Sequence, residues 1–185
     1  MRKKGKVLTL ALILALVGII VSGTVAYYTN SETAHNIITT GGVDIELVET
    51  NAEGEPWETV TGVLPGMEID KRVSVEAADD CAEAWVRVKV GVEVLDKEGN
   101  PLPNEGVVVN YLTEHGWTEK DGYWYYKNPV KTGEATETLF DTVTFGENLD
   151  NRYQKAKATV TVMAQAVQSK NNGTSALEAA GWPED

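Results

Sequence analysis

The chain has 185 residues, of which 42% are apolar and 24% charged, so it is long enough and apolar enough to bury a core. Acidic residues outnumber basic ones by 28 to 16, and this net charge of −12 argues against nucleic-acid binding, because few cations could neutralise phosphates. One cysteine excludes an internal disulfide framework. With only two histidines, a histidine-based zinc site or a Ser-His-Asp catalytic triad has few candidate residues. Composition therefore points away from most enzymes.

Residues 1–26 have the pattern of a secretory signal peptide. Basic residues at positions 2, 3, 4 and 6 precede an uncharged run, residues 7–21, and small residues follow it. This run is shorter than the roughly 20 apolar residues that span a membrane as a helix. We therefore expect an N-terminal signal-peptide helix that is cleaved after Ala26, with Thr24 as the small residue two positions earlier and Tyr27 as the new first residue. A retained membrane anchor is the alternative.

Cleavage would remove four positive charges and no negative charge, which changes the net charge from −12 to −16. Such an excess of negative charge keeps an extracellular protein soluble and repels anionic membranes. We therefore expect the mature chain to be secreted and to have neither a membrane nor a nucleic acid as partner. The charge could also attract divalent cations or a basic partner.

Apolar and polar residues alternate over much of the mature chain, which is typical of strands with one buried face. The alternation is clearest at residues 84–95 and 157–168, and it also predicts strands at residues 43–47, 67–75 and 139–145. A run of aromatic residues predicts a short strand at residues 123–127, and residues 107–112 are expected to form another. Turn residues separate these segments, and Asp121-Gly122 between aromatic residues predicts a hairpin. Only residues 147–154 and 174–180 have helical character. We predict that residues 27–185 form a single all-β domain, a jelly-roll-like antiparallel β-sandwich.

Several segments, in this order, resemble the TasA/camelysin family of secreted proteins of Gram-positive bacteria. GTVAYYT at positions 23–29 resembles the signal and maturation region of the family, and ITTGGVDI at positions 38–45 resembles its first long strand. The later matching segments are LPG (64–66), KRVSV (71–75), AWVRVKV (84–90), DGYWYYK (121–127), LFDTVTF (139–145) and VTVMAQAVQ (160–168).

The resemblance implies export through a signal peptidase of SipW type and self-association into extracellular fibres of the biofilm matrix. In fibres of this family, the N-terminal segment is added as a strand to the next subunit, where it pairs with an open sheet edge. Residues 27–38 are the candidate donor strand, with few charges, no Pro and no Gly, and with Tyr27, Tyr28, Ile37 and Ile38 as apolar residues. The alternative is that this strand pairs within the sheet of its own subunit.

Some camelysin-type members are classed as metalloproteases, which makes an extracellular metalloprotease the main rival function. His35 and His115 are 80 positions apart and no His-Glu-x-x-His motif is present, so a zinc site built from them and Glu114 has little support. A Gly-x-Ser-x-Gly motif is absent as well. We therefore expect a non-enzymatic structural protein with no catalytic residue, no metal and no cofactor.

Three smaller features leave alternatives open. Asp79, Asp80 and Glu83 could hold calcium, or they could form a solvated acidic turn. Cys81 could be a small, partly buried residue, or it could form a disulfide between molecules. Six aromatic residues could stack on sugars, as in a monomeric surface or carbohydrate-binding module, or they could pack in the core; they are Trp85, Trp117, Tyr123, Trp124, Tyr125 and Tyr126.

Overall fold

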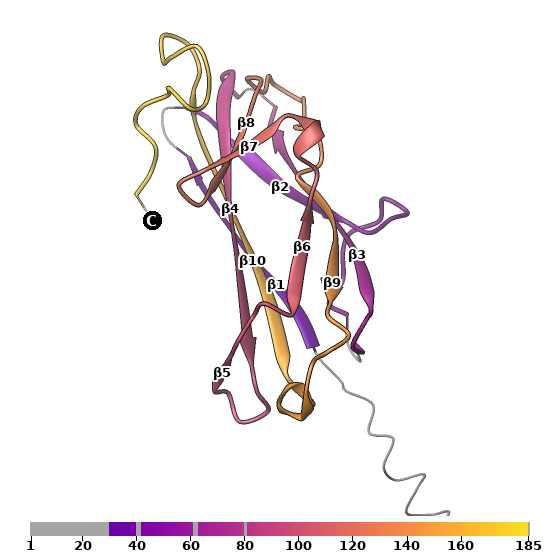
Figure 1. The fold of residues 1–185 in the computed structure, drawn as a ribbon. Helices are drawn as coiled ribbons and strands as arrows, with labels where there is room; N and C mark the ends of the chain where they lie inside the picture. The colour runs from indigo at the N-terminus through magenta and orange to yellow at the C-terminus, as the bar shows by residue number, and fades with distance from the viewer. Residues whose placement is uncertain (1–29, 40–41, 61–62, 80, 185) are drawn as a thin grey trace, which may run out of the picture.

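A computed structural model describes residues 30–39, 42–60, 63–79 and 81–184, with the backbone alone for residues 30–39. Two β-sheets pack face to face, which confirms the predicted all-β sandwich (Figure 1). The chain crosses repeatedly between the two sheets, as in a jelly roll. The expected signal-peptide helix at residues 1–26 lies outside the described residues.

The larger sheet has the strand order β1-β10-β4-β8-β7, and the short β5 pairs with the far end of β4. All of its neighbouring strands are antiparallel except β1, which runs parallel to β10. In this order the strands are β1 (Asn30–Thr39), β10 (Lys157–Gln168), β4 (Ala84–Leu95), β8 (Tyr123–Tyr126) and β7 (Trp117–Lys120), with β5 at Pro101–Leu102.

The smaller sheet has the order β2-β3-β9-β6, and its strands are all antiparallel. A β-bulge interrupts the pairing of β3 with β9 between Asp70 and Val73. The strands are β2 (Ile45–Thr50), β3 (Glu68–Ala77), β9 (Phe140–Phe145) and β6 (Val107–Tyr111).

All seven segments predicted as strands are strands, with ends that differ from the prediction by at most three residues. The predicted hairpin is also present: β7 and β8 pair from Lys120↔Tyr123 onwards, and Asp121 and Gly122 have φ values of 54° and 79°. Positive φ at both central positions is the requirement of a type I′ turn. The sequence did not predict β5, because a strand of two residues is too short to show an alternation of apolar and polar side chains.

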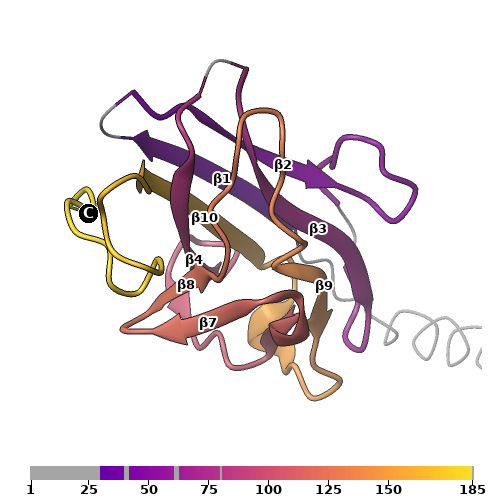
Figure 2. The ribbon, with the colours of Figure 1, turned by 90° about the horizontal axis from the view of Figure 1, so that it is seen from above.

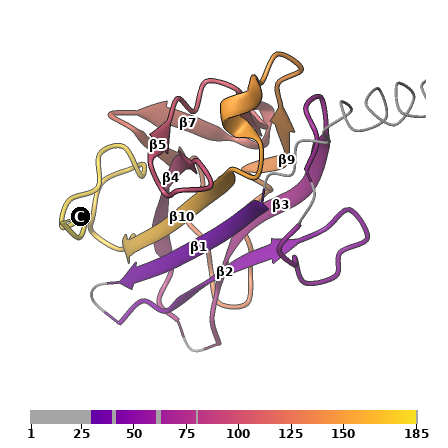
Figure 3. The same ribbon diagram turned by 90° about the horizontal axis from the view of Figure 1, so that it is seen from below.

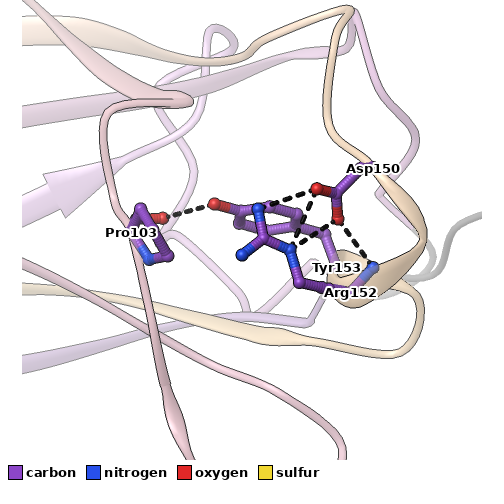
Figure 4. Close-up of polar contacts among 4 residues, drawn as sticks. All are labelled: Pro103, Asp150, Arg152 and Tyr153. Atoms are coloured by element: carbon purple, nitrogen blue, oxygen red, sulfur yellow. Dashed lines mark hydrogen bonds and ion pairs between the residues drawn. The ribbon is translucent and has the colours of Figure 1, made fainter.

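The helical prediction for residues 147–154 is confirmed in shortened form (Figure 4). A 3-10 helix, η2, spans Asn151–Tyr153, and the Asp150 side chain caps it by accepting a hydrogen bond of 2.8 Å from the Arg152 backbone nitrogen. Tyr153 is buried, and its hydroxyl donates to the carbonyl oxygen of Pro103 at 2.8 Å. Burial of this one ring fixes the turn against the end of the sandwich.

The prediction of a helix at residues 174–180 is wrong, because the segment forms turns. The Asn172 side chain donates to the carbonyl oxygen of Ala180 and accepts from its backbone nitrogen, which closes residues 172–180 into a loop. Ala176 is drawn onto the larger sheet at the same time. A helix this short is marginal without tertiary support, so these contacts decide its conformation.

Alternate residues of the long strands fill the core, as the period of two predicts. On β10 every second residue from Ala158 to Ala166 has no exposed surface, and on β4 Val86 and Val88 are equally buried. Val90 and Val92, which share their face, are only partly buried beside the core. The antiparallel ladder between β4 and β10 therefore forms the centre of the larger sheet.

Lys71 is the exception to this pattern, because it lies on the core face of β3 between Ile69 and Val73 and is only 1% exposed. Its ammonium nitrogen lies 2.9 Å from Oε2 of Glu49 and 3.7 Å from the ring centroid of Trp57. Burial lowers the pKa of Lys71 below its ordinary value of 10.5, and the hydrogen bond and charge of Glu49 oppose this shift. The edge of the core thus contains one ion pair covered by an indole ring.

Removing one member of this pair should cost far more than removing both. Lys71→Met should lower the free energy of unfolding by about 3–5 kcal/mol, because the Glu49 carboxylate would stay buried without its cation. Lys71→Met with Glu49→Leu should return the protein to within about 1 kcal/mol of its original stability or above it. Urea unfolding followed by circular dichroism measures both. A double variant as unstable as the single one would contradict this account.

The same pair should make stability depend on alkaline pH. In the pH range between the lowered pKa of Lys71 and 10.5, the unfolded chain keeps a proton that the folded chain has released. Stability contributed by this group therefore rises with pH through that range. The original protein should accordingly gain stability relative to the double variant, and a parallel pH dependence of the two would contradict the assignment.

Candidate assembly strand and the strap that braces its partner

β1, the first strand of the described chain, lies at one edge of the larger sheet and pairs with the last strand, β10 (Figure 3). The ladder is parallel and involves all ten residues of β1, from Asn30↔Lys157 to Thr39↔Ala166. Among the described strands, β10 is the only one to which β1 is hydrogen-bonded. The whole strand is therefore held by a single ladder.

This strand overlaps most of the segment that the sequence predicts as the donor. Ile37 and Ile38 lie opposite Ala164 and Gln165 of β10, whereas Tyr27 and Tyr28 lie outside the described residues. The predicted cleavage residues Thr24 and Ala26 lie outside them as well. In a single chain the segment thus belongs to its own sheet, and strand exchange would have to open this ladder.

β10 would keep its place if β1 left, because twelve residue pairs join it to β4 on its other side, from Lys157↔Leu95 to Gln168↔Ala84. Loss of β1 would leave the outer backbone groups of β10 unpaired. Unpaired strand edges of this kind readily accept another strand. In this structure β10 is therefore the strand that accepts β1.

The residues that follow β10, residues 169–184, fold back over the outer face of β10, β4 and β8, and we call them the C-terminal strap (Figure 2). The indole nitrogen of Trp85 on β4 donates to the carbonyl oxygen of Asn172 at 2.8 Å. The ring of Trp182 meets that of Tyr125 on β8 edge to face, with centroids 5.9 Å apart. The strap is thus anchored near both of its ends.

Arg87 of β4 joins the strap to the acceptor strand. Its Nε donates to Oε1 of Gln165 on β10 at 2.7 Å, and its Nη2 donates to the carbonyl oxygen of Pro183 at 3.2 Å. Its guanidinium carbon lies 3.9 Å from the ring centroid of Tyr123 and 4.7 Å from that of Trp182. A planar cation that makes hydrogen bonds to two segments and contacts two aromatic rings is a rigid joint. Position 165, opposite Ile38 of β1, is thereby fixed.

The structure separates the two histidines considered for a zinc site. His35 lies on β1, and His115 ends the 3-10 helix η1 (Thr113–His115), which leads into β7 at the opposite edge of the larger sheet. Three strands lie between β1 and β7, and neighbouring strands are about 4.8 Å apart, which places the two edges about 19 Å apart. Nδ1 of His115 lies 3.1 Å from the carbonyl oxygen of Thr138.

Of the acidic residues near Cys81, the structure describes Asp79 and Glu83. The Glu83 side chain accepts a hydrogen bond of 2.9 Å from the Ser169 hydroxyl, and Asp80 lies outside the described residues. Within the described part of the chain, no group of three His, Cys, Asp or Glu side chains is placed to hold a metal ion. Cys81 is buried, and its Sγ accepts from the Asp44 backbone nitrogen at 3.2 Å.

The aromatic residues considered for sugar stacking are engaged in packing. Trp117 and Tyr126 lie in the core with ring centroids 5.0 Å apart, and Trp124 stacks on Tyr111 at 4.2 Å. Trp85 packs under the strap, and Tyr123 and Tyr125 contact Arg87. This placement matches the simpler of the two interpretations, core and face packing.

Sequence reasoning missed Arg87 and Trp182, which hold the strap on the larger sheet. It also missed Lys71, the buried cation of the smaller sheet. Arg87 occupies a position that the alternation of β4 assigns to the solvent-facing side, where charge is expected. The sequence feature that could have identified Arg87 is its aromatic surroundings. Trp85 lies on the same face of the strand, and the predicted hairpin at Asp121-Gly122 is rich in tyrosine. Trp182, between Gly181 and Pro183, was a lone aromatic residue in a polar tail.

No family model, curated protein or solved structure matches this chain. Among the described residues, the helices are all too short or too polar to cross a membrane.

Trp182→Ala should release the strap without unfolding the sandwich. The strap packs on the outer face of the larger sheet, in a cluster separate from the core between the two sheets. Hydrogen exchange of amides in residues 170–184 should accelerate by about tenfold, as for local opening of a weakly held segment. Leu177→Ala is the matched control, since Leu177 lies on the same strap but is 42% exposed. Unchanged exchange in Trp182→Ala would show that Trp182 does not anchor the strap.

Proposed function

We propose that this protein is a secreted structural protein that forms extracellular fibres of the biofilm matrix by donating β1 to the β10 edge of the next subunit. The observation that carries the proposal is the β1–β10 ladder, which holds a ten-residue edge strand through one partner. Such a strand can leave as a unit, and an identical strand from a neighbour restores every backbone hydrogen bond that was lost.

The junction that follows β1 supports this exchange. Thr40, Gly41 and Gly42 follow the strand in the sequence, and β2 begins at Ile45. Gly42 has a φ of 72°, and a Cβ atom built there would meet no heavy atom within 4 Å. A short link of this kind can change direction at small cost, so that β1 can extend away from its own sheet.

Resemblance and charge support the extracellular part of the proposal. GTVAYYT at positions 23–29 resembles the signal and maturation region of the TasA/camelysin family, which implies processing by a signal peptidase of SipW type. Cleavage after Ala26 would leave only three residues before β1 and a net charge of −16. The assignment includes no catalytic residue, metal or cofactor, and the two histidine-bearing edges are too far apart to share a metal ion.

A disulfide between β1 and β10 distinguishes exchange from pairing within one subunit. Glu32 and Thr159 are register partners, and strands about 4.8 Å apart bring their Cα atoms into the range that a disulfide bridges. Glu32→Cys with Thr159→Cys, in a Cys81→Ser background, should be assembled under reducing conditions and then oxidised. Exchange predicts a ladder of covalent oligomers on a non-reducing gel.

The same variant contains its own control. Oxidation before assembly should lock β1 onto its own β10, give a monomer band and abolish filaments in electron micrographs. Thr159→Cys alone should produce no ladder beyond a dimer. Filaments in which every disulfide lies within one chain would overturn strand exchange, and failure of the reduced variant and of the original protein to form filaments would overturn the fibre proposal.

Export should shorten the protein so that it begins at Tyr27, because cleavage follows the small residues that end the signal pattern. Intact-mass spectrometry of the protein in culture medium tests this expectation. Ala26→Asp, which places a charge where the peptidase requires a small residue, should leave the uncleaved chain with the cells. A protein that starts at Met1 in a membrane fraction would instead support a retained anchor.

A further inference from the structure

The connection from β2 to β3 surrounds a hollow that strand exchange does not use. Its volume of about 530 Å³ is within the range of small-ligand pockets. The hollow lies beside the smaller sheet, and no residue of β10 is among the described residues that line it. It is lined by Asn51, Glu55, Pro56, Trp57, Glu58, Val60 and Asp70.

Trp57 forms a fixed aromatic wall of this hollow. Its indole nitrogen donates to the carbonyl oxygen of Asp70 at 3.2 Å, and its backbone nitrogen donates to the carbonyl oxygen of Glu49 at 3.0 Å. The ammonium of buried Lys71 lies 3.7 Å from the ring centroid and is held in place by Glu49. The ring is thus oriented before any ligand arrives, which lowers the entropic cost of binding.

The rim of the hollow is equally well organised. Oδ1 of Asn51 accepts hydrogen bonds from the backbone nitrogens of Glu53 and Glu55 at 3.1 and 2.9 Å, and the Asn51 backbone nitrogen donates to the carbonyl oxygen of Glu55 at 2.9 Å. These hydrogen bonds hold the loop that carries Glu55 against the end of β2. The backbone from which the Glu55 side chain extends is therefore fixed.

The lining favours a neutral ligand that is rich in hydroxyl groups. Carboxylates accept hydrogen bonds from hydroxyl groups, and the negative face of an indole attracts the partly positive C–H groups on one side of a sugar ring. Glu55, Glu58 and Asp70 would repel an anionic polymer. A cationic ligand would share the Trp57 ring with the ammonium of Lys71, and like charges on one ring disfavour each other.

We propose that this hollow binds a neutral sugar unit of a polysaccharide, which stacks on Trp57 and donates hydroxyl hydrogen bonds to Glu55, Glu58 and Asp70. This site is separate from the assembly strand, so that each subunit of a fibre would present one sugar-binding hollow without giving up any pairing of β1.

Binding can be measured by isothermal titration of the purified protein with cellotetraose, maltotetraose and chitotetraose, each at up to about 10 mM. At least one of these neutral sugars should bind. Trp57→Ala should weaken that binding about tenfold or more, and Glu58→Gln should weaken it less. Trp182→Ala is the matched control, because it removes the ring of the C-terminal strap on the other sheet and should leave the affinity unchanged.

Several outcomes would overturn the proposal. No binding of any neutral tetrasaccharide, equal loss in Trp57→Ala and Trp182→Ala, or tighter binding of tetragalacturonic acid or tetramethylammonium would each contradict a neutral-sugar site. Circular dichroism checks that Trp57→Ala is folded, and Trp57→Phe, which keeps a ring, should retain part of the affinity if the first variant is not. The titration uses the monomeric protein, so its outcome is independent of whether fibres form.

Discussion

The antiparallel ladder between β4 and β10 is the interaction on which the rest of the structure depends. Its inner face supplies valine and alanine side chains to the core, and its outer face receives the C-terminal strap through Trp85 and Arg87. Its free side accepts β1. Because β10 is held by β4 along its whole length, the loss or replacement of β1 changes one edge and leaves the sandwich in place.

The longest strands could be predicted because burial of one face imposes an alternation of apolar and polar residues. Residues 84–95 and 157–168 are the best examples, and their bounds agree with the structure. The hairpin at Asp121-Gly122 was equally predictable, since few residues tolerate positive φ at both positions of a type I′ turn. In these strands and in this turn, the structure that the local sequence favours is also the one found in the fold.

The rest depended on contacts between distant parts of the chain. Lys71 has the parity of a core residue, but its charge made the alternation ambiguous until Glu49 and Trp57 provided partners. The tail from Thr174 onwards has residues that favour a helix, but the loop closed by Asn172 and the docking of Trp182 prevent one. The parallel pairing of β1 with β10 left no local signal, because register between remote strands is set by the assembled sheet.

The pairing of the first described strand with the last also determines the order in which the molecule can be completed. Asn30 and Lys157 are partners across 127 positions of sequence, so β1 has no place in the larger sheet until almost the whole chain has been made and has folded. Contacts of such long range form late. A folding chain therefore passes through a stage in which the residues of β1 have been made but the β10 edge that pairs with them has not yet formed, and during that stage β1 has no partner strand in its own chain.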